Sequence, residues 1–237
     1  KAKHYGAKLK AVPGSLKEAI TFAIKTWTSN PDYAYIIGSC VSSSPFPKIV
    51  TFAQSIIGKE IREQSMAQEG KIPDMIIGCL GGGSNFAGSI YEFLDEPSVK
   101  KIGVEAAETA ALSNGTPGIM QGMKTYMLQS GDGSKSLGGS SLGAGIQYFS
   151  VGPMHAYLKS LGAVDYTYAT DKEILDAYKL VAKTEGISAA LEPMAGAAEL
   201  IKQAKNKPKD YIICLSLCGR GEKDLDTIQK HIGKDFE

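Results

Sequence analysis

Short apolar segments of β type alternate along this chain with longer segments whose apolar residues recur at helical spacing. This alternation is typical of βα units, in which parallel strands form one sheet and helices cover its faces. We therefore expect an α/β fold with a parallel sheet flanked by helices. A chain of 237 residues accommodates one large α/β domain, or one domain plus part of another, and we favour two partial domains.

The apolar spacing predicts the individual elements. Strands are expected over residues 8–12, 34–37, 74–80, 101–105, 165–169 and 210–215. Helices are expected over residues 15–27, 47–68, 85–94, 154–161, 170–185 and 194–205. Ser15, with Glu18 three residues later, forms a capping box, and Thr170 caps a second helix. Residues 131–145 are rich in glycine and serine, and form either a flexible linker or a lid or binding loop.

Composition excludes several classes of partner. The 26 basic and 25 acidic residues are evenly spread, which leaves no basic surface for nucleic acid or an anionic membrane. No apolar run approaches the roughly 18 residues that cross a bilayer, and the first residues lack the apolar part of a signal peptide. Four cysteines without paired spacing argue against a zinc site or a disulfide scaffold. We expect a cytoplasmic protein whose partner is a small molecule or another protein.

A glycine-rich turn follows the predicted strand at residues 74–80 and opens a predicted helix. This glycine loop consists of Gly81, Gly82, Gly83, Ser84 and Asn85. Glycines allow an anion to approach backbone N–H groups at the positive end of a helix, so the loop favours a phosphate. The Lys-Ser/Thr of a P-loop is missing, which makes a monophosphate the better fit. A dinucleotide site is an alternative, because Glu105 follows the loop at about the sequence spacing of an acid that binds ribose. The other alternative is a tight turn that binds no ligand.

Further motifs accompany the glycine loop in a fixed order. They are "GSLKEAITFAIKTW" and "IIGSCVSSSPFP" near the start, and "VGPMHAYLKSLGAVDY", "TEGISAALE" and "GRGEKD" after the loop. With the loop, they resemble the β chain of tryptophan synthase in register along the whole chain. That family binds pyridoxal 5′-phosphate in a two-domain fold of type II, with a parallel sheet in each domain. The resemblance implies that residues 1–53 are the tail of the mobile amino-terminal domain and that residues 54–237 form the carboxy-terminal, phosphate-binding domain.

The resemblance also implies the site residues. The glycine loop and Gly219 would bind the cofactor. Glu192 matches a glutamate beside the cofactor ring, where a carboxylate influences ring protonation, and is the one catalytic candidate. Sequence alone favours a capping or surface acid at Glu192. Cys218 stands where the family has a serine that faces the pyridine nitrogen, and a thiol there is a weaker but still neutral partner. The alternative for Cys218 is a buried structural cysteine.

A monovalent cation, sodium or potassium, is implied at the backbone carbonyls of Gly81, Tyr148 and Ser150. His155 also matches a family histidine, and we interpret it as structural. Gln147 stands where the family has an aspartate that helps close the active site over the substrate.

The family's Schiff-base lysine lies in a His-Lys motif upstream of every motif matched here. Lys3 and His4 have the reverse order and lie in a stretch that aligns elsewhere. We therefore expect that the intact protein is a lyase that joins serine and indole into tryptophan, as a homodimer with tryptophan synthase α chains, and that this chain alone is inactive. Two alternatives stay open. One is another β-replacement enzyme of the same fold, such as a cysteine synthase relative, and the other is a non-catalytic fragment that binds phosphate or the cofactor.

Overall fold

The computed structural model describes residues 2–14 and 16–233. Contacts divide the chain into two compact units, Lys1–Ile37 and Gly38–Glu237. The division after Ile37 is a property of these contacts, and the domain boundary expected after residue 53 stays a prediction.

The first unit contains the 3-10 helix η1 (Ala2–Tyr5) and the helix α1 (Leu16–Thr28), as expected for residues 15–27. Trp27 stacks on Tyr35 with ring centroids 5.1 Å apart. The strands expected over residues 8–12 and 34–37 are wrong. Neither segment has a paired strand among the described residues, and a strand requires such a partner for its N–H and C=O groups. The capping box expected from Ser15 lies outside the described residues.

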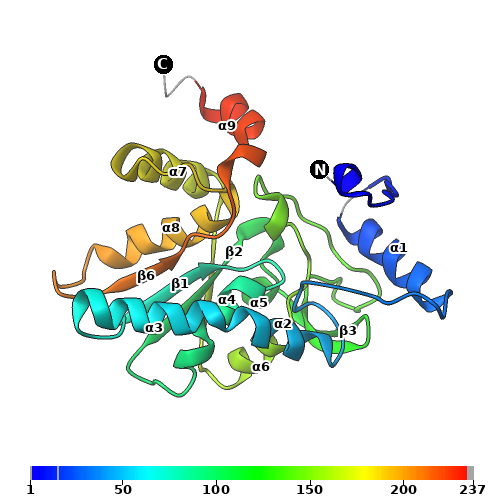
Figure 1. Cartoon of the computed structure of the whole chain (residues 1–237), viewed down its shortest axis with the longest axis horizontal. Helices are drawn as coiled ribbons and strands as arrows, with labels where there is room; N and C mark the ends of the chain where they lie inside the picture. The colour runs from blue at the N-terminus through cyan, green and yellow to red at the C-terminus, as the bar shows by residue number, and fades with distance from the viewer. Residues whose placement is uncertain (1, 15, 234–237) are drawn as a thin grey trace. The chain divides into compact units, whose positions relative to one another are not determined.

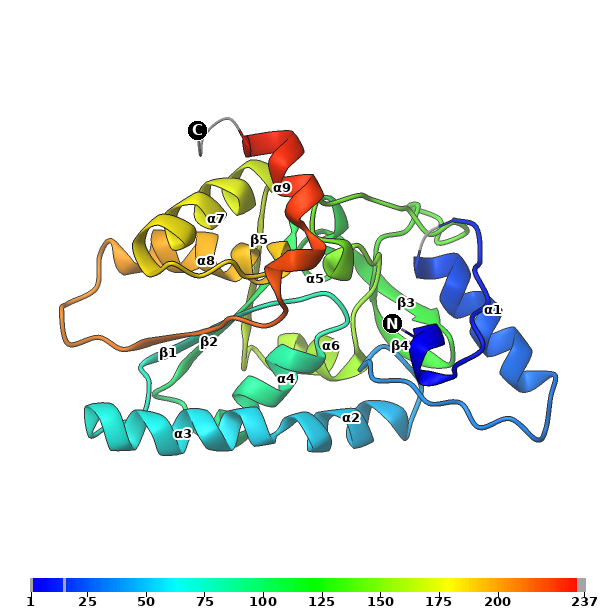
Figure 2. The same ribbon diagram turned by 45° about the horizontal axis from the view of Figure 1, so that its top comes forward.

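Four parallel strands form the sheet of the second unit, in the order β5-β2-β1-β6; Figure 1 labels β2, β1 and β6, and Figure 2 labels β5. They are β1 (Met75–Cys79), β2 (Lys100–Ala106), β5 (Asp165–Ala169) and β6 (Ile213–Ser216). Ile77 of β1 lies beside Ile102 on one side and Leu215 on the other. Every residue of β1 is buried, which explains its continuous apolar sequence. The four strands predicted from residue 74 onward are therefore confirmed.

Helices cover both faces of this sheet (Figure 2). On one face lie α7 (Asp171–Glu185), α8 (Leu191–Ala204) and α9 (Leu225–Ile232), which contribute to the core cluster that contains Ile77. On the other lie α3 (Ile56–Glu69), α4 (Ser84–Ile90) and α6 (Pro153–Ser160), which contribute to the core cluster that contains Ile76. Ile76 and Ile77 serve different cores because successive strand residues point to opposite faces. The parallel sheet flanked by helices is thus confirmed.

Two predicted helices differ in their extent. The segment at residues 47–68 forms two helices, α2 (Phe46–Gln54) and α3, because the backbone tightens at Ser55. Both the N–H and the hydroxyl of Ser55 donate hydrogen bonds to the carbonyl of Phe52, three residues back. The segment at residues 85–94 forms α4 and one 3-10 turn, η2 (Tyr91–Phe93). Thr170 and Glu173 form the capping box of α7.

Sequence analysis predicted neither α9 nor an antiparallel hairpin of β3 (Thr116–Met120) and β4 (Met123–Met127). The hairpin turns at Gln121 and Gly122, with φ of 49° and 77°. The remaining short elements are η3 (Ala107–Thr109), α5 (Ala111–Asn114), η4 (Ala144–Ile146) and η5 (Gly221–Lys223).

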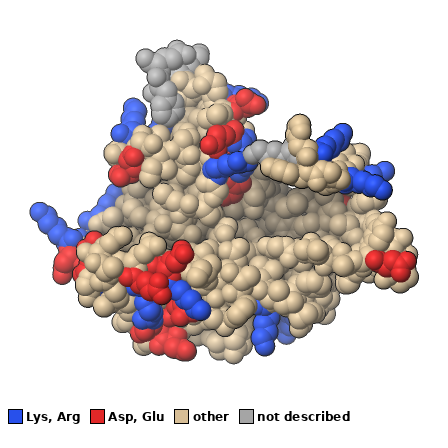
Figure 3. All heavy atoms as spheres, viewed as in Figure 1, with Lys and Arg blue, Asp and Glu red and all other residues tan. Residues whose placement is uncertain are grey.

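Acidic and basic side chains are interspersed on the face of the molecule in Figure 3, and a broad area between them carries neither. Arg62 and Glu96, for example, form an ion pair of 2.9 Å. Among the described residues, no helix combines the length and the apolar composition needed to cross a bilayer.

Candidate functional site

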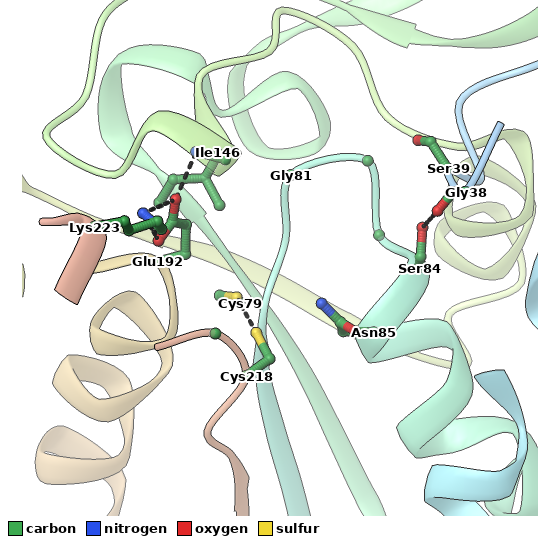
Figure 4. A pocket seen from close by; sticks show the side chains of 14 residues that line it. Gly38, Ser39, Cys79, Gly81, Ser84, Asn85, Ile146, Glu192, Cys218 and Lys223 are labelled. Atoms are coloured by element: carbon green, nitrogen blue, oxygen red, sulfur yellow. Dashed lines mark hydrogen bonds and ion pairs between the residues drawn. The ribbon is translucent and has the colours of Figure 1, made fainter. Parts of the chain in front are cut away.

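A cavity of about 330 Å³ lies beside the glycine loop, where β1 ends and α4 begins. All eight residues that the sequence assigned to cofactor binding line this cavity, namely Gly81, Gly82, Gly83, Ser84, Asn85, Glu192, Cys218 and Gly219. Gly145, Ile146 and Lys223 line it as well. Segments more than a hundred residues apart in the sequence therefore meet at one end of the sheet, as Figure 4 shows.

Neighbouring protein atoms explain the three glycines of the loop. A Cβ atom on Gly81 would collide with the carbonyl oxygen of Gly145, and one on Gly82 would lie 2.6 Å from the Ser39 hydroxyl. Gly83 has a φ of 96°, and a Cβ there would collide with the ring of His155. The glycines thus let the loop pack closely on the protein itself, which the sequence alone did not reveal.

The backbone N–H groups of the glycine loop have no hydrogen-bond acceptor among the described residues. Within the described part of the chain, no hydrogen bond uses the backbone N–H of any residue from Gly81 to Asn85. The Ser84 hydroxyl fixes the loop instead, because it accepts from the N–H of Cys40 and donates to the carbonyl of Gly38. A row of N–H groups along a cavity wall is suited to an anion.

His155 holds the glycine loop through the backbone carbonyl of Gly83. Its Nε2 donates to the carbonyl of Gly83 at 2.8 Å, and its Nδ1 lies 3.0 Å from the Tyr166 hydroxyl. Because a carbonyl only accepts, the proton sits on Nε2, and Nδ1 accepts from Tyr166. Complete burial lowers the pKa of His155 to about 4, although its bond to Gly83 acts in the opposite direction. The ring is therefore neutral, and the structural interpretation of His155 agrees with these contacts.

Glu192 lies in the first turn of α8 and is only 8 % exposed, so the alternative of a surface acid is wrong. Its Oε1 accepts from the N–H of Gly145 at 2.6 Å, and its Oε2 lies 2.8 Å from Nζ of Lys223. The Gly145 contact fixes one end of the segment at residues 131–145 to the cavity. This end of the segment is therefore not a free linker, and its role as a lid or binding loop stays a prediction.

Lys223 also lines the cavity. Sequence analysis did not predict it as a site residue, although it belongs to the GRGEKD motif that carries the family resemblance. Its ammonium group bonds both Glu192 and Asp224, and Asp224 in turn accepts from the N–H of Leu191 at the start of α8. Burial opposes the charge of Lys223, but these two carboxylates outweigh it and raise the pKa of Lys223. Lys223 is therefore a protonated cation that ties η5 to α8.

Cys218 follows β6, and its Sγ lies 3.5 Å from Sγ of Cys79 at the end of β1 (Figure 4). Sequence analysis predicted Cys218 as a site residue but not Cys79. The bond to Cys218 and burial raise the pKa of Cys79 well above its usual range. The contact with Cys79 lowers the pKa of Cys218, against the effect of burial, and either sulfur of the pair can be the hydrogen-bond donor.

The remaining predicted positions lie near the cavity. Tyr148 and Ser150 are buried in the segment that leads from η4 to α6, and the cation site expected at their carbonyls stays a prediction. The described residues contain no cluster of three or more metal-ligating His, Cys, Asp or Glu side chains. The Gln147 amide donates to the carbonyl of Ser141, a bond within its own segment.

The fold is that of a pyridoxal-phosphate dependent enzyme. Residues 1–219 match the model of that family, and the chain belongs to it. The chain is 44% identical over 229 residues to the tryptophan synthase β chain of Allorhizobium ampelinum, covering 93% of this chain and 56% of that protein. It is 45% identical over 233 residues to that of Ruegeria pomeroyi, covering 94% and 56%. The resemblance found in the sequence is thus confirmed, and the chain spans about half the length of these relatives.

Two solved structures share the fold. An O-ureido-L-serine synthase variant with O-ureido-L-serine bound has a TM-score of 0.70 and 17% identity, covering 97% of this chain and 63% of that one. An L-serine ammonia-lyase from Rhizomucor miehei has a TM-score of 0.71 and 19% identity, covering 97% and 69%. At these identities they support the fold, which is type II among pyridoxal-phosphate enzymes.

Proposed function

We propose that this chain holds pyridoxal 5′-phosphate in the cavity at the end of β1, with its phosphate on the open N–H groups of the glycine loop. The observation that carries the proposal is the row of N–H groups from Gly81 to Asn85, which have no partner among the described residues and belong to residues that line the cavity. A dianionic phosphate supplies acceptors for several of them at once.

The other end of the cavity suits an aromatic ring with polar substituents. Glu192 and Lys223 lie across the cavity from Ser84, with Cys218 and Asn85 between them along its floor (Figure 4). In our proposal, the Glu192 carboxylate orients the ring, and Cys218 presents a neutral thiol to the ring nitrogen. When bound, the cofactor supplies an electron sink that weakens bonds at the α-carbon of an amino acid.

The chain's own residues then hold the cofactor in place. Gly145 and Lys223 fix the Glu192 carboxylate through hydrogen bonds, so its orientation is set before any ligand arrives. His155 fixes the carbonyl side of the glycine loop and leaves its N–H side free. Lys223 is the only lysine among the described residues that line the cavity, and its two carboxylate partners keep it protonated. It is therefore a poor nucleophile and does not replace the Schiff-base lysine expected upstream.

For the intact protein, we propose the tryptophan synthase β reaction, in which indole replaces the β-hydroxyl of serine. The relatives at 44–45% identity, named tryptophan synthase β chain, support this activity. A homodimer with α chains, and a monovalent cation on the carbonyls of Gly81, Tyr148 and Ser150, belong to the same proposal. This chain alone would bind cofactor without turnover, and a cytoplasmic location fits a biosynthetic enzyme of this kind.

Equilibrium dialysis of the 237-residue chain with pyridoxal phosphate and with pyridoxal tests the phosphate site. The two ligands share the ring and differ in the phosphate. We expect pyridoxal phosphate to bind at least about tenfold more tightly, a difference of about 1.4 kcal/mol, and inorganic phosphate to compete. Equal affinity for the two ligands would contradict a phosphate-binding role of the glycine loop.

The activity is tested on the intact protein. Serine plus indole should give tryptophan, whereas O-acetylserine plus sulfide should give little cysteine. The reverse preference would favour the cysteine synthase alternative. Failure of the intact protein in both reactions, with cofactor binding retained, would favour the non-catalytic alternative.

A further inference from the structure

Two cysteines from different strands meet on the cavity floor. Cys79 is the last residue of β1, Cys218 lies two residues beyond β6, and their sulfur atoms are 3.5 Å apart. β1 and β6 are neighbours in the sheet, and their pairing brings the two cysteines close together. The other two cysteines have different surroundings. Cys40 contacts the Thr51 hydroxyl, and Cys214 packs against the core cluster that contains Ile76.

The two thiols are unequal in a way that suits stepwise oxidation. Cys218 is partly exposed, lines the cavity and shares with Cys79 a hydrogen bond that lowers the pKa of Cys218. Cys79 also lines the cavity but is only 8 % exposed, and its pKa is raised. A thiolate is the nucleophilic form of cysteine, and an accessible thiolate with a second thiol in contact is typical of a redox-active pair.

We propose that Cys79 and Cys218 form a reversible disulfide when a peroxide enters the cavity. The Cys218 thiol first loses its proton. The resulting thiolate attacks one oxygen of hydrogen peroxide, the O–O bond breaks, and the departing hydroxide takes up a proton to leave as water. Cys218 is then a sulfenic acid. The Cys79 sulfur attacks the Cys218 sulfur, the S–O bond breaks, and the Cys79 proton leaves with the hydroxide as a second water. Two thiols are oxidised by two electrons in total, and one peroxide is reduced.

Closure requires a small movement. The sulfur atoms must approach from 3.5 Å to about 2.05 Å. Cys79 belongs to a strand with every residue buried and cannot move far. Cys218 lies in the loop after β6, next to Gly219, whose φ of 78° marks a turn, so the loop side supplies the movement. A disulfide would take the Cys218 thiol away from the ring position, and cofactor affinity would fall. This consequence, unlike the disulfide, depends on the proposed function.

The test treats the reduced chain with hydrogen peroxide, counts free thiols after denaturation and maps peptides without reduction. The four thiols of the wild-type chain should fall to two, with a mass loss of about 2 Da and a linked peptide pair that contains Cys79 and Cys218. Dithiothreitol should restore four. Cys79→Ser and Cys218→Ser should form no intramolecular disulfide.

Cys40→Ser and Cys214→Ser are matched controls, because each removes one thiol outside the pair and should leave the Cys79–Cys218 link intact. Three outcomes in the wild-type chain would overturn the proposal: four thiols that persist, a disulfide between other cysteines, or a Cys218 sulfinic acid without any disulfide. Peptide mapping needs no cofactor, so failure of pyridoxal phosphate binding would leave this result unaffected. Conversely, if the disulfide formed without weakening cofactor binding, only the expected fall in cofactor affinity would be refuted.

Discussion

Nζ of Lys223 lies 2.8 Å from Oε2 of Glu192, which couples the turn after β6 to the first turn of α8 on the cavity wall. Glu192 is 8 % exposed, so Lys223 and the N–H of Gly145 supply contacts that water would otherwise make to its carboxylate. The pair positions the carboxylate that our proposal sets beside the cofactor ring.

Lys223→Met should therefore destabilise the chain, because it leaves a buried carboxylate without its cation. Loss of one partner of a buried pair costs about 3–5 kcal/mol, and partial exposure of Lys223, at 43%, reduces our expectation to about 1–2 kcal/mol. Urea unfolding measures the loss. Lys172→Met is the control, because the Lys172–Asp176 pair is exposed and should contribute less than about 0.5 kcal/mol. Equal effects of both variants would contradict a special role for the cavity pair.

The sequence predicted the parts of this site but not their pairing. β1 is recognisable because burial on both faces requires an unbroken apolar run, and the glycine loop because three glycines follow that strand. The Cys79–Cys218 contact joins residues 139 apart in the sequence, and depends on β6 lying beside β1. No local pattern encodes strand order, so only the family resemblance brought Cys218 to the site.

Elsewhere, local signals were present but weak or misleading. The run Met123–Met127 alternates buried and more exposed residues, yet its turn at Gln121 lacks the Asn-Gly or Asp-Gly signal of a hairpin. The segments at residues 8–12 and 34–37 have strand-like composition without a paired strand among the described residues. Strand propensity alone does not satisfy backbone hydrogen bonds. The Thr170 capping box was predictable because all its contacts are local.

Stability should fall between pH 6.5 and pH 4 through His155. Its pKa is lowered from 6.5 to about 4 in the folded chain, so in this window the unfolded chain binds the extra proton. The contribution of the neutral ring is complete above pH 6.5 and decreases as the pH falls, by up to about 3 kcal/mol near pH 4. Urea unfolding at pH 7, 6 and 5 measures the slope. His155→Gln removes this titration and retains the others, so a slope that is the same in both proteins would refute the assignment.

Gly83→Ala should be strongly destabilising, for two reasons. Its φ of 96° strains any side chain, and the new Cβ would collide with the buried ring of His155. We expect a loss of about 3 kcal/mol or more in urea unfolding. Gly162→Ala is the matched control, because Gly162 has a φ of 64° with no atom within 4 Å of the added Cβ, and should lose only about 1 kcal/mol. Similar losses in both would mean that backbone conformation alone accounts for Gly83.

Asn85→Asp separates the stability of the glycine loop from its ability to bind an anion. Asn85 is the second residue of α4, where a carboxylate faces the positive end of the helix and should leave stability unchanged or raise it by about 0.5 kcal/mol. The same charge lies in the cavity and repels a phosphate, so pyridoxal phosphate should bind at least about tenfold more weakly. Pyridoxal, without the phosphate, should bind with nearly unchanged affinity. Asn85→Ala controls for loss of the amide, and should weaken pyridoxal phosphate binding less than Asn85→Asp does. If the aspartate weakened both ligands equally, the phosphate would not lie at the glycine loop, and the N–H groups of Gly81 to Asn85 would need another partner.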